Sequence, residues 1–260
     1  MHLPDTTFIG IDPTAGKKPF TFAALDMDCN LLALDSGEME ETLNLISKSV
    51  NAYVAVNGPR NPNIGLVKKE NEKRGLRPGQ MRGADLRLAE YLLREKGIII
   101  SSTPSKKELC PEWTQLCFAL YENLDELGFL PFPAENSPKQ CLETHPHAAF
   151  SVMLEQQPLS KPTLEGRLQR QLVLHEANVG IKNPMEFFEE ITSHRLIHGI
   201  LPLDKVYFPE QLDAIAAAYV AYLAGHEPQR LSFIGSRDEG IIVLPASKLL
   251  EKYNYPSIPN

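Results

Sequence analysis

Residues 8–19 read FIGIDPTAGKKP, an apolar segment that runs into an aspartate and then stops. Its β-branched and aromatic residues favour a strand, and the Pro, Thr and Gly that follow end that strand. Alternation places Gly10 and Asp12 on one face and Ile9 and Ile11 on the other, and both faces look buried. This pattern predicts a central strand of a sheet with a carboxylate at its carboxyl end.

The position of Asp12 allows two interpretations. A carboxylate at the end of a buried strand is costly to desolvate unless it has a partner or binds a cation. Asp12 either caps the following loop through an Asx-turn, or binds a metal ion at the carboxyl edge of the sheet, where α/β proteins place their sites. Gly10, two residues earlier on the same face, leaves space beside the carboxylate.

Length and composition indicate a folded chain. The 260 residues suffice for one large domain or two small ones, and 43% of them are hydrophobic, as in ordinary globular proteins. The N-terminal MHLPDTTF lacks the basic start and apolar core of a secretory signal. No apolar run approaches the roughly 18 residues of a membrane span, so we expect no membrane partner. The four cysteines form no CxxC pair, which predicts reduced, mostly buried thiols in a cytoplasmic protein.

The charge of the chain is uneven. The net charge of −7 argues against a generic nucleic-acid binder, but residues 60–96 hold 10 Lys and Arg against 5 Asp and Glu. This basic tract is either a surface that faces phosphates or a solvated face without a partner. Its candidate nucleic-acid contacts are Arg60, Lys68, Lys69, Lys73, Arg74, Arg77 and Arg82.

The order of predicted elements indicates a mixed α/β sheet with helices on both faces. Three strands joined by short turns form an antiparallel meander, and a helix then leads to a strand parallel to its neighbour. The predicted strands are 6–12, 20–26, 30–34, 51–56 and either 97–101 or 139–144. Helices are expected from 39, over 83–95, from 111, within 165–200 and from 209, and residues 58–80 read as a long loop.

Six motifs occur in an order that resembles a known family. They are FIGID (8–12), VAVNGPR (54–60), RGADLRLAEYL (82–92), ETHPHAAF (143–150), GRLQRQ (166–171) and QLDAIAAAYVAYLAG (211–225). Together they are similar to an uncharacterised family of predicted nucleases with an RNase H-like fold, classed as a domain of unknown function. The resemblance implies one RNase H-like domain over residues 1–260, with a helical insertion around 150–205.

The resemblance also implies an acidic site that binds Mg²⁺ or Mn²⁺. Asp12, Glu143 and Asp213 match its catalytic and metal-binding carboxylates. Asn57 stands where members of the family usually carry an Asp, and an amide can offer a metal its carbonyl oxygen but no charge. Arg82 and Asp85 match a polar pair in the middle of the chain.

The chemistry of such a cluster does not depend on the resemblance. Converging carboxylates raise one another's pKa unless a cation neutralises them, and Mg²⁺ or Mn²⁺ bound by oxygen ligands can activate water for phosphodiester hydrolysis. The small residues Ala214 and 216–218 predict that their helix packs close to the sheet and brings Asp213 near Asp12. Alternatively, Asp213 only interacts with the dipole of its helix start.

Two histidines flank a proline beside Glu143. His145 and His147 either support the acidic site from outside, as polar neighbours or general bases, or lie incidentally in a turn.

Three functions therefore compete. The first is a metal-dependent nuclease. The second is a non-catalytic module of the same fold that binds nucleic acid or a protein, which the amide of Asn57 favours. The third is an actin-like ATP-binding protein, which shares the aspartate of the first strand but needs two copies of the core, whereas this chain shows one.

Overall fold

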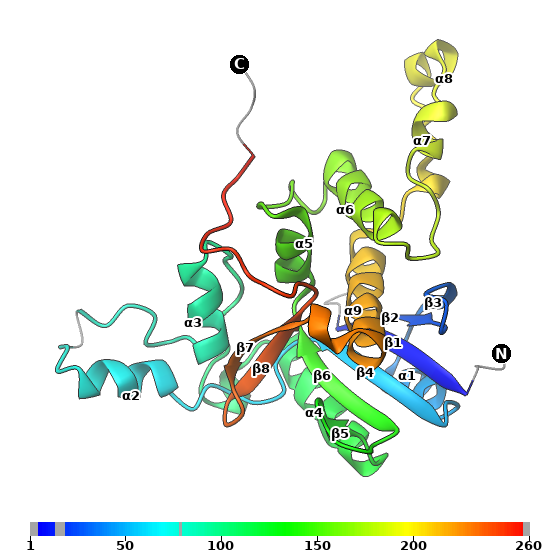
Figure 1. Ribbon diagram of the computed structural model, residues 1–260. Helices are drawn as coiled ribbons and strands as arrows, with labels where there is room; N and C mark the ends of the chain where they lie inside the picture. Colours follow the sequence, from blue (N-terminus) through cyan, green and yellow to red (C-terminus); the bar gives the residue numbers. More distant parts are fainter. Residues whose placement is uncertain (1–4, 14–18, 78–79, 257–260) are drawn as a thin grey trace.

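The computed structural model describes residues 5–13, 19–77 and 80–256 and is drawn in Figure 1. Eight strands within these residues form one mixed sheet, ordered β3-β2-β1-β4-β6-β8-β7, with β5 paired to β6 beside this path. The strands are β1 (Thr6–Pro13), β2 (Phe20–Leu25), β3 (Leu31–Gly37), β4 (Asn51–Asn57), β5 (Leu130–Pro131), β6 (Lys139–Thr144), β7 (Ser232–Ser236) and β8 (Gly240–Leu244).

β1 lies inside the sheet, as its sequence predicts. β2 pairs with it antiparallel on one side and β4 pairs with it parallel on the other. All its residues after Thr6 are buried, which is typical of a strand covered on both faces. The strands predicted at 6–12, 20–26, 30–34 and 51–56 are confirmed, and the next parallel strand is β6 rather than the segment 97–101.

Helices cover both faces of the sheet (Figure 1). The helices are α1 (Met39–Ile46), α2 (Leu66–Lys73), α3 (Leu88–Glu95), α4 (Glu112–Glu126), α5 (Pro146–Leu154), α6 (Leu164–Glu176), α7 (Glu186–Glu189), α8 (Ser193–Ile197) and α9 (Pro209–His226). On one face, Phe8 and Leu142 pack with α9 and α5 in the largest core cluster. On the other face, Ile9 and Ile11 pack with α1 and α4 in a second cluster.

The segment 98–100 is not the strand that its three isoleucines predict. Gly97 has a φ of 85°, its N–H donates to the carbonyl of Arg94, and the N–H of Ile98 donates to that of Leu93. These two bonds are the Schellman ending of α3, with Ile98 as its apolar contact residue. Ile98 joins a third core cluster under α3, α5 and β8, whereas Ile99 is 70% exposed.

Two boundaries in the basic region also differ from the sequence prediction. The expected loop over 58–80 contains α2, which buries only Val67 and therefore lacks an apolar stripe. Its charged residues form ion pairs one turn apart, such as Glu70 with Arg74, and such pairs support exposed helices. The helix expected from Gly83 begins at Leu88 instead, since Gly83 has a φ of 68°.

The stretch 150–205 is largely helical, with α6, α7 and α8 between α5 and α9. Figure 1 shows α7 and α8 reaching away from the sheet. Across the described residues, no helix combines the length and apolar character that crossing a membrane requires.

Candidate functional site

Asp12 and Asn57 meet at the carboxyl edge of two parallel strands. β1 and β4 pair in register up to Ile11 and Val56, so the next residue of each strand falls in the same row. The side-chain amide of Asn57 donates to Oδ1 of Asp12 at 2.5 Å. Asp12 is only 5% exposed, and the amide of Asn57 fixes the orientation of its carboxylate.

Helix α9 brings Asp213 to the same place. A Cβ atom at Gly10 would lie 2.1 Å from the carbonyl oxygen of Ala214 and 2.1 Å from the nitrogen of Ala218. The backbone of α9 therefore rests directly on β1, and only a glycine permits this approach. The predicted close packing of this helix is confirmed, and Asp213, one residue before the contact, is 5% exposed.

Lys161 supplies the positive charge of this site. It lies in the loop between α5 and α6, and its Nζ forms an ion pair with Oδ2 of Asp213. Its side chain is 44% exposed, whereas that of Asp213 is 7% exposed. The lysine thus reaches from the solvent boundary to a buried carboxylate.

One lysine does not offset two buried carboxylates. Burial raises the pKa of Asp12 to about 7, and the charge of Asp213 adds to the rise, although Lys161 and Asn57 oppose it. Burial also raises the pKa of Asp213, against the effect of Lys161. Raised carboxylate pKa values of this kind are common at functional sites, where a proton or a cation completes the charge balance.

Glu143 belongs to a neighbouring cluster. In the parallel pairing of β4 and β6, Val56 lies opposite Glu143 and Asn57 opposite Thr144. Glu143 is therefore one row back from Asn57, and its side chain points to the other face of the sheet. There it forms a buried ion pair with both terminal nitrogens of Arg87. The structure brings Asp12, Asn57 and Asp213 together and holds Glu143 with Arg87.

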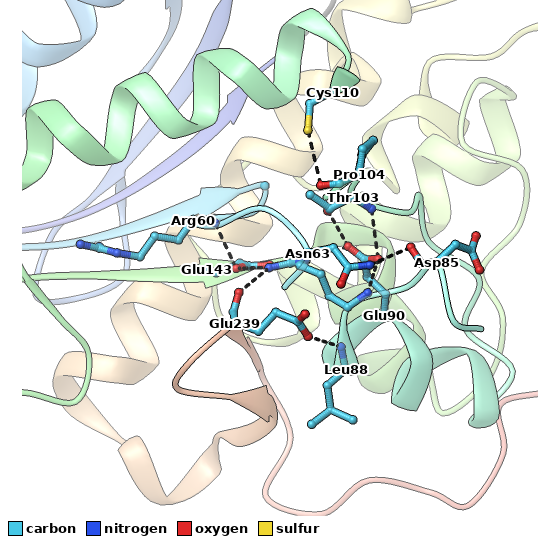
Figure 2. Close-up of polar contacts among 12 residues, drawn as sticks. Arg60, Asn63, Asp85, Leu88, Glu90, Thr103, Pro104, Cys110, Glu143 and Glu239 are labelled. Atoms are coloured by element: carbon cyan, nitrogen blue, oxygen red, sulfur yellow. Dashed lines mark hydrogen bonds and ion pairs between the residues drawn. The ribbon is translucent and has the colours of Figure 1, made fainter. Parts of the chain in front are cut away.

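Arg87 pairs with two buried carboxylates, those of Glu90 and Glu143. Figure 2 shows these and the carboxylate of Glu239 converging from α3, β6 and the β7–β8 turn. The Nε of Arg87 donates to Glu90 at 2.9 Å, and its Nη1 donates to the backbone carbonyl of Glu239 at 3.4 Å. The carboxylate of Glu239 accepts the backbone N–H groups of Ile64 and Leu88. This cluster fixes the loop after β4 against α3 and the β7–β8 hairpin.

The two histidines lie beside the Lys161 end of the site. His145 precedes α5, and its ring centroid is 6.4 Å from that of His147. Burial lowers the pKa of His145 to about 3, helped by the charges of His147 and Lys161. Burial also lowers the pKa of His147. Both rings are therefore neutral at neutral pH, and their lowered pKa values make them weak bases there.

The basic tract is spread over α2 and its flanking loops. The guanidinium of Arg60 bonds Asp125 at 2.6 and 2.7 Å, so its charge is locally compensated. Figure 1 shows α2 at the periphery beyond α3, on the side opposite β3. The remaining residues of the tract, namely Lys68, Lys69, Lys73, Arg74, Arg77 and Arg82, are exposed, as is Asp85.

The sequence prediction missed Lys161 and Arg87. Lys161 stands in the loop sequence SKPT, which carries no periodic signal. Arg87 has a partial signal, because Glu90 follows three residues later and its carboxylate accepts the backbone N–H of Arg87 at the start of α3. Within the described residues, no three His, Cys, Asp or Glu side chains are grouped so that they could hold a metal ion.

Comparison with known proteins identifies a family for most of the chain. Residues 10–239 match the family model described as "Protein of unknown function (DUF429)". No curated protein and no solved structure gives a significant match. Because the match covers both Asp12 and Asp213 and far more than half of the sequence, the chain belongs to the DUF429 family.

Proposed function

We propose that this protein is a metal-dependent nuclease with an RNase H-like sheet. One observation carries the proposal: two buried carboxylates, Asp12 and Asp213, meet at the carboxyl edge of the sheet with one lysine as counter-charge. The strand order supports it, because an antiparallel meander of β1, β2 and β3 is continued on the other side of β1 by the parallel strands β4 and β6.

The donor atoms suit one divalent cation of the Mg²⁺ or Mn²⁺ type. The carboxylates of Asp12 and Asp213 would hold it, with the carbonyl oxygen of Asn57 as a neutral ligand. An ion bound there would activate water and stabilise negative charge on the phosphate. Because Glu143 is paired with Arg87, the donor set fits one ion better than two.

The protein's own groups take distinct roles in this proposal. Asn57 orients Asp12 through its hydrogen bond. Lys161, which reaches the site from the solvent boundary, would contact a non-bridging oxygen of the phosphate. His145, whose pKa burial lowers to about 3, would stay neutral at neutral pH and would add no positive charge to the site.

The test is a cleavage assay on labelled DNA and RNA with Mg²⁺, Mn²⁺ or EDTA. We expect slow activity that prefers Mn²⁺, since Mn²⁺ binds such sites more tightly and accepts less regular geometry. Asp12→Asn should abolish cleavage and Asn57→Asp should raise it, whereas the exposed control Asp35→Asn should have no effect. Cleavage that survives Asp12→Asn, or continues in EDTA, would contradict the metal mechanism.

A second candidate function is a non-catalytic module that binds nucleic acid. The pairing of Asp213 with Lys161 and of Glu143 with Arg87 favours it, because both carboxylates already have cationic partners in the protein. Binding of Mn²⁺ without cleavage, in both the wild type and Asn57→Asp, would support this function over the first.

A further inference from the structure

A cavity of about 440 Å³ opens beside Glu143, in the gap between β6 and β8. The two strands pair only at Glu143 and Ile242, because β5 occupies the same edge of β6 at Gln140 and Cys141. Apolar residues form most of the wall, among them Leu130, Phe132, Pro133, Ile241 and Val243.

Glu143 lines this cavity, and its carboxylate has one unused acceptor position. Its Oε2 atom accepts from Nη1 of Arg87 at 3.0 Å and from the backbone N–H of Arg60 at 3.2 Å. Its Oε1 atom accepts only from Nη2 of Arg87 among the described residues. Since a carboxylate oxygen can accept two hydrogen bonds, Oε1 can take one more donor.

The remaining lining groups suit a flat ring that carries a phosphate. The ring of Tyr121 lines the cavity and lies 5.2 Å from the guanidinium carbon of Arg60. Arg237 also lines the cavity. It is exposed and has no hydrogen bond or ion pair with any residue that the structure describes. An apolar slot with an acceptor in its wall and an arginine at the solvent side matches a nucleotide in shape and charge.

We propose that this cavity binds one nucleobase of a nucleic-acid strand, with its exocyclic amino group donating to Glu143 and its phosphate at Arg237. The inference rests on the proposed function, whose substrate it makes specific. Arg60 on the cavity wall is three residues after Asn57, which bonds Asp12. Glu143 is one row from Asn57 on the neighbouring strand, so a strand bound at Asp12 would have to cross the carboxyl edge of the sheet to reach the cavity.

The proposal predicts a preference between bases. Cytosine presents an amino group where uracil presents a carbonyl oxygen, and an oxygen facing Glu143 is repelled by the carboxylate. Cytidine monophosphate should therefore bind more tightly than uridine monophosphate by about tenfold or more, the discrimination typical of one well-placed contact to a base. Ribose 5-phosphate, which has no base, should bind more weakly than either nucleotide.

Calorimetry on the full chain in EDTA tests this without relying on catalysis. Ala134→Phe narrows the cavity from its rim, and Arg237→Glu reverses the charge of an exposed residue. Ala134→Phe should weaken the binding of both nucleotides and leave the weak binding of ribose 5-phosphate unchanged. Arg237→Glu should weaken the binding of all three ligands, because each carries a phosphate. Lys248→Glu, an exposed control away from this cavity, should leave their binding unchanged.

Thermal unfolding checks whether Ala134→Phe is folded. If it is not, the binding measurements on Arg237→Glu still test the proposal. Equal binding of the two nucleotides, or ribose 5-phosphate binding as well as they do, would overturn the assignment. A short oligonucleotide distinguishes a strand from a free nucleotide. If Ala134→Phe weakens cytidine monophosphate but leaves the oligonucleotide unaffected, the cavity does not hold a base of a strand.

The proposed nuclease can fail separately from this inference. Nucleotide binding that depends on Ala134 and Arg237, without cleavage in any metal, would keep the base pocket and reject catalysis. Cleavage that is lost in Asp12→Asn but unchanged in Ala134→Phe and Arg237→Glu would keep catalysis and reject the pocket.

Discussion

The ammonium of Lys161 pairs with the buried carboxylate of Asp213, at the position where a metal ion would also neutralise Asp12. In the proposed metal site, Lys161 and a divalent ion would therefore compete for the same oxygen atoms. Lys161→Met should bind Mn²⁺ more tightly than the wild type and should be less stable without metal by about 1–2 kcal/mol, because Asp213 loses its partner. Titration calorimetry with Mn²⁺ and thermal unfolding measure the two effects. The exposed control Lys107→Met, which breaks the surface pair with Glu122, should change neither, and weaker metal binding in Lys161→Met would contradict the competition.

The raised pKa of Asp12 has a defined effect on stability. Its value is about 7 in the folded protein against an ordinary 3.8, so between these values the folded state holds a proton that the unfolded state has lost. The contribution of Asp12 to stability is therefore complete below about pH 4, falls as the pH rises towards 7, and is constant above that. Relative to the wild type, Asp12→Asn should gain stability across this window, by on the order of a few kcal/mol at pH 8.

Urea unfolding at pH 4, 5.5, 7 and 8 checks this difference between wild type and Asp12→Asn. Asp35→Asn is the matched control, because Asp35 is exposed and its variant should follow the wild type at every pH. A constant difference between wild type and Asp12→Asn from pH 4 to 8 would show that Asp12 has an ordinary pKa.

Removal of the Arg87 guanidinium should destabilise the protein strongly. Arg87→Met leaves Glu90 and Glu143 buried without a cation, and breaking a buried ion pair on one side costs about 3–5 kcal/mol. Arg94→Met removes an exposed arginine from the same helix and should cost far less. Chemical unfolding compares the two variants, and adding Glu143→Gln to Arg87→Met should recover part of the loss. Equal stability of Arg87→Met and Arg94→Met would exclude this role for the buried cluster.

Gly10→Ala should move helix α9 and with it Asp213. The added methyl group meets backbone atoms of α9 at 2.1 Å, so the helix has to move, at a cost of about 1–3 kcal/mol or more. Gly37→Ala is the comparison, because the nearest atoms there belong to the side chain of Glu41 and not to a backbone. Gly10→Ala should unfold at a much lower temperature than Gly37→Ala. The accompanying shift of Asp213 should also weaken Mn²⁺ binding. Wild-type stability in Gly10→Ala would mean that α9 does not lie this close to β1.

The basic tract gives a prediction about salt. If Lys68, Lys69 and Lys73 face phosphates, reversing all three charges should weaken nucleic-acid binding and flatten its dependence on salt concentration. Reversal of Lys48, Lys106 and Lys248, which are exposed elsewhere, controls for net charge. Fluorescence anisotropy over a series of salt concentrations measures both slopes. Equal slopes in the two triple variants would identify the tract as a solvated surface.

Short-range patterns predicted the half of the sheet around β1. Connections of few residues favour the antiparallel pairing of β1, β2 and β3, and the helix before β4 favours a parallel neighbour. The strand predicted from the three isoleucines at 98–100 was wrong, because the backbone N–H of Ile98 ends helix α3 instead of pairing in the sheet. β7 was missed because it is short and includes two serines and a glycine that give no alternating pattern.

The site was predictable only where backbone packing dictated it. Gly10 in β1 and the alanines of α9 are small residues, and they predict that the two elements pack closely. This packing places Asp213 near Asp12. The partners of the carboxylates were not predictable. Lys161 is 52 residues from Asp213, and Arg87 is 56 residues from Glu143. Nothing local in either stretch specifies the other, because the fold alone brings them together.

Because β8 and β6 share a single ladder pair, we expect the β7–β8 hairpin to be a weakly held end of the sheet. The β7–β8 hairpin packs with α3 around the third core cluster, and that unit can open while the sheet from β3 to β6 stays closed. Amide hydrogens of β7 and β8 should then exchange with solvent faster than those of β1 and β4. Such opening would widen the cavity beside Glu143 and leave the contact between α9 and β1 intact. The free energy of opening the hairpin would then control ligand entry, whereas the packing of α9 on β1 would keep Asp12 and Asp213 together.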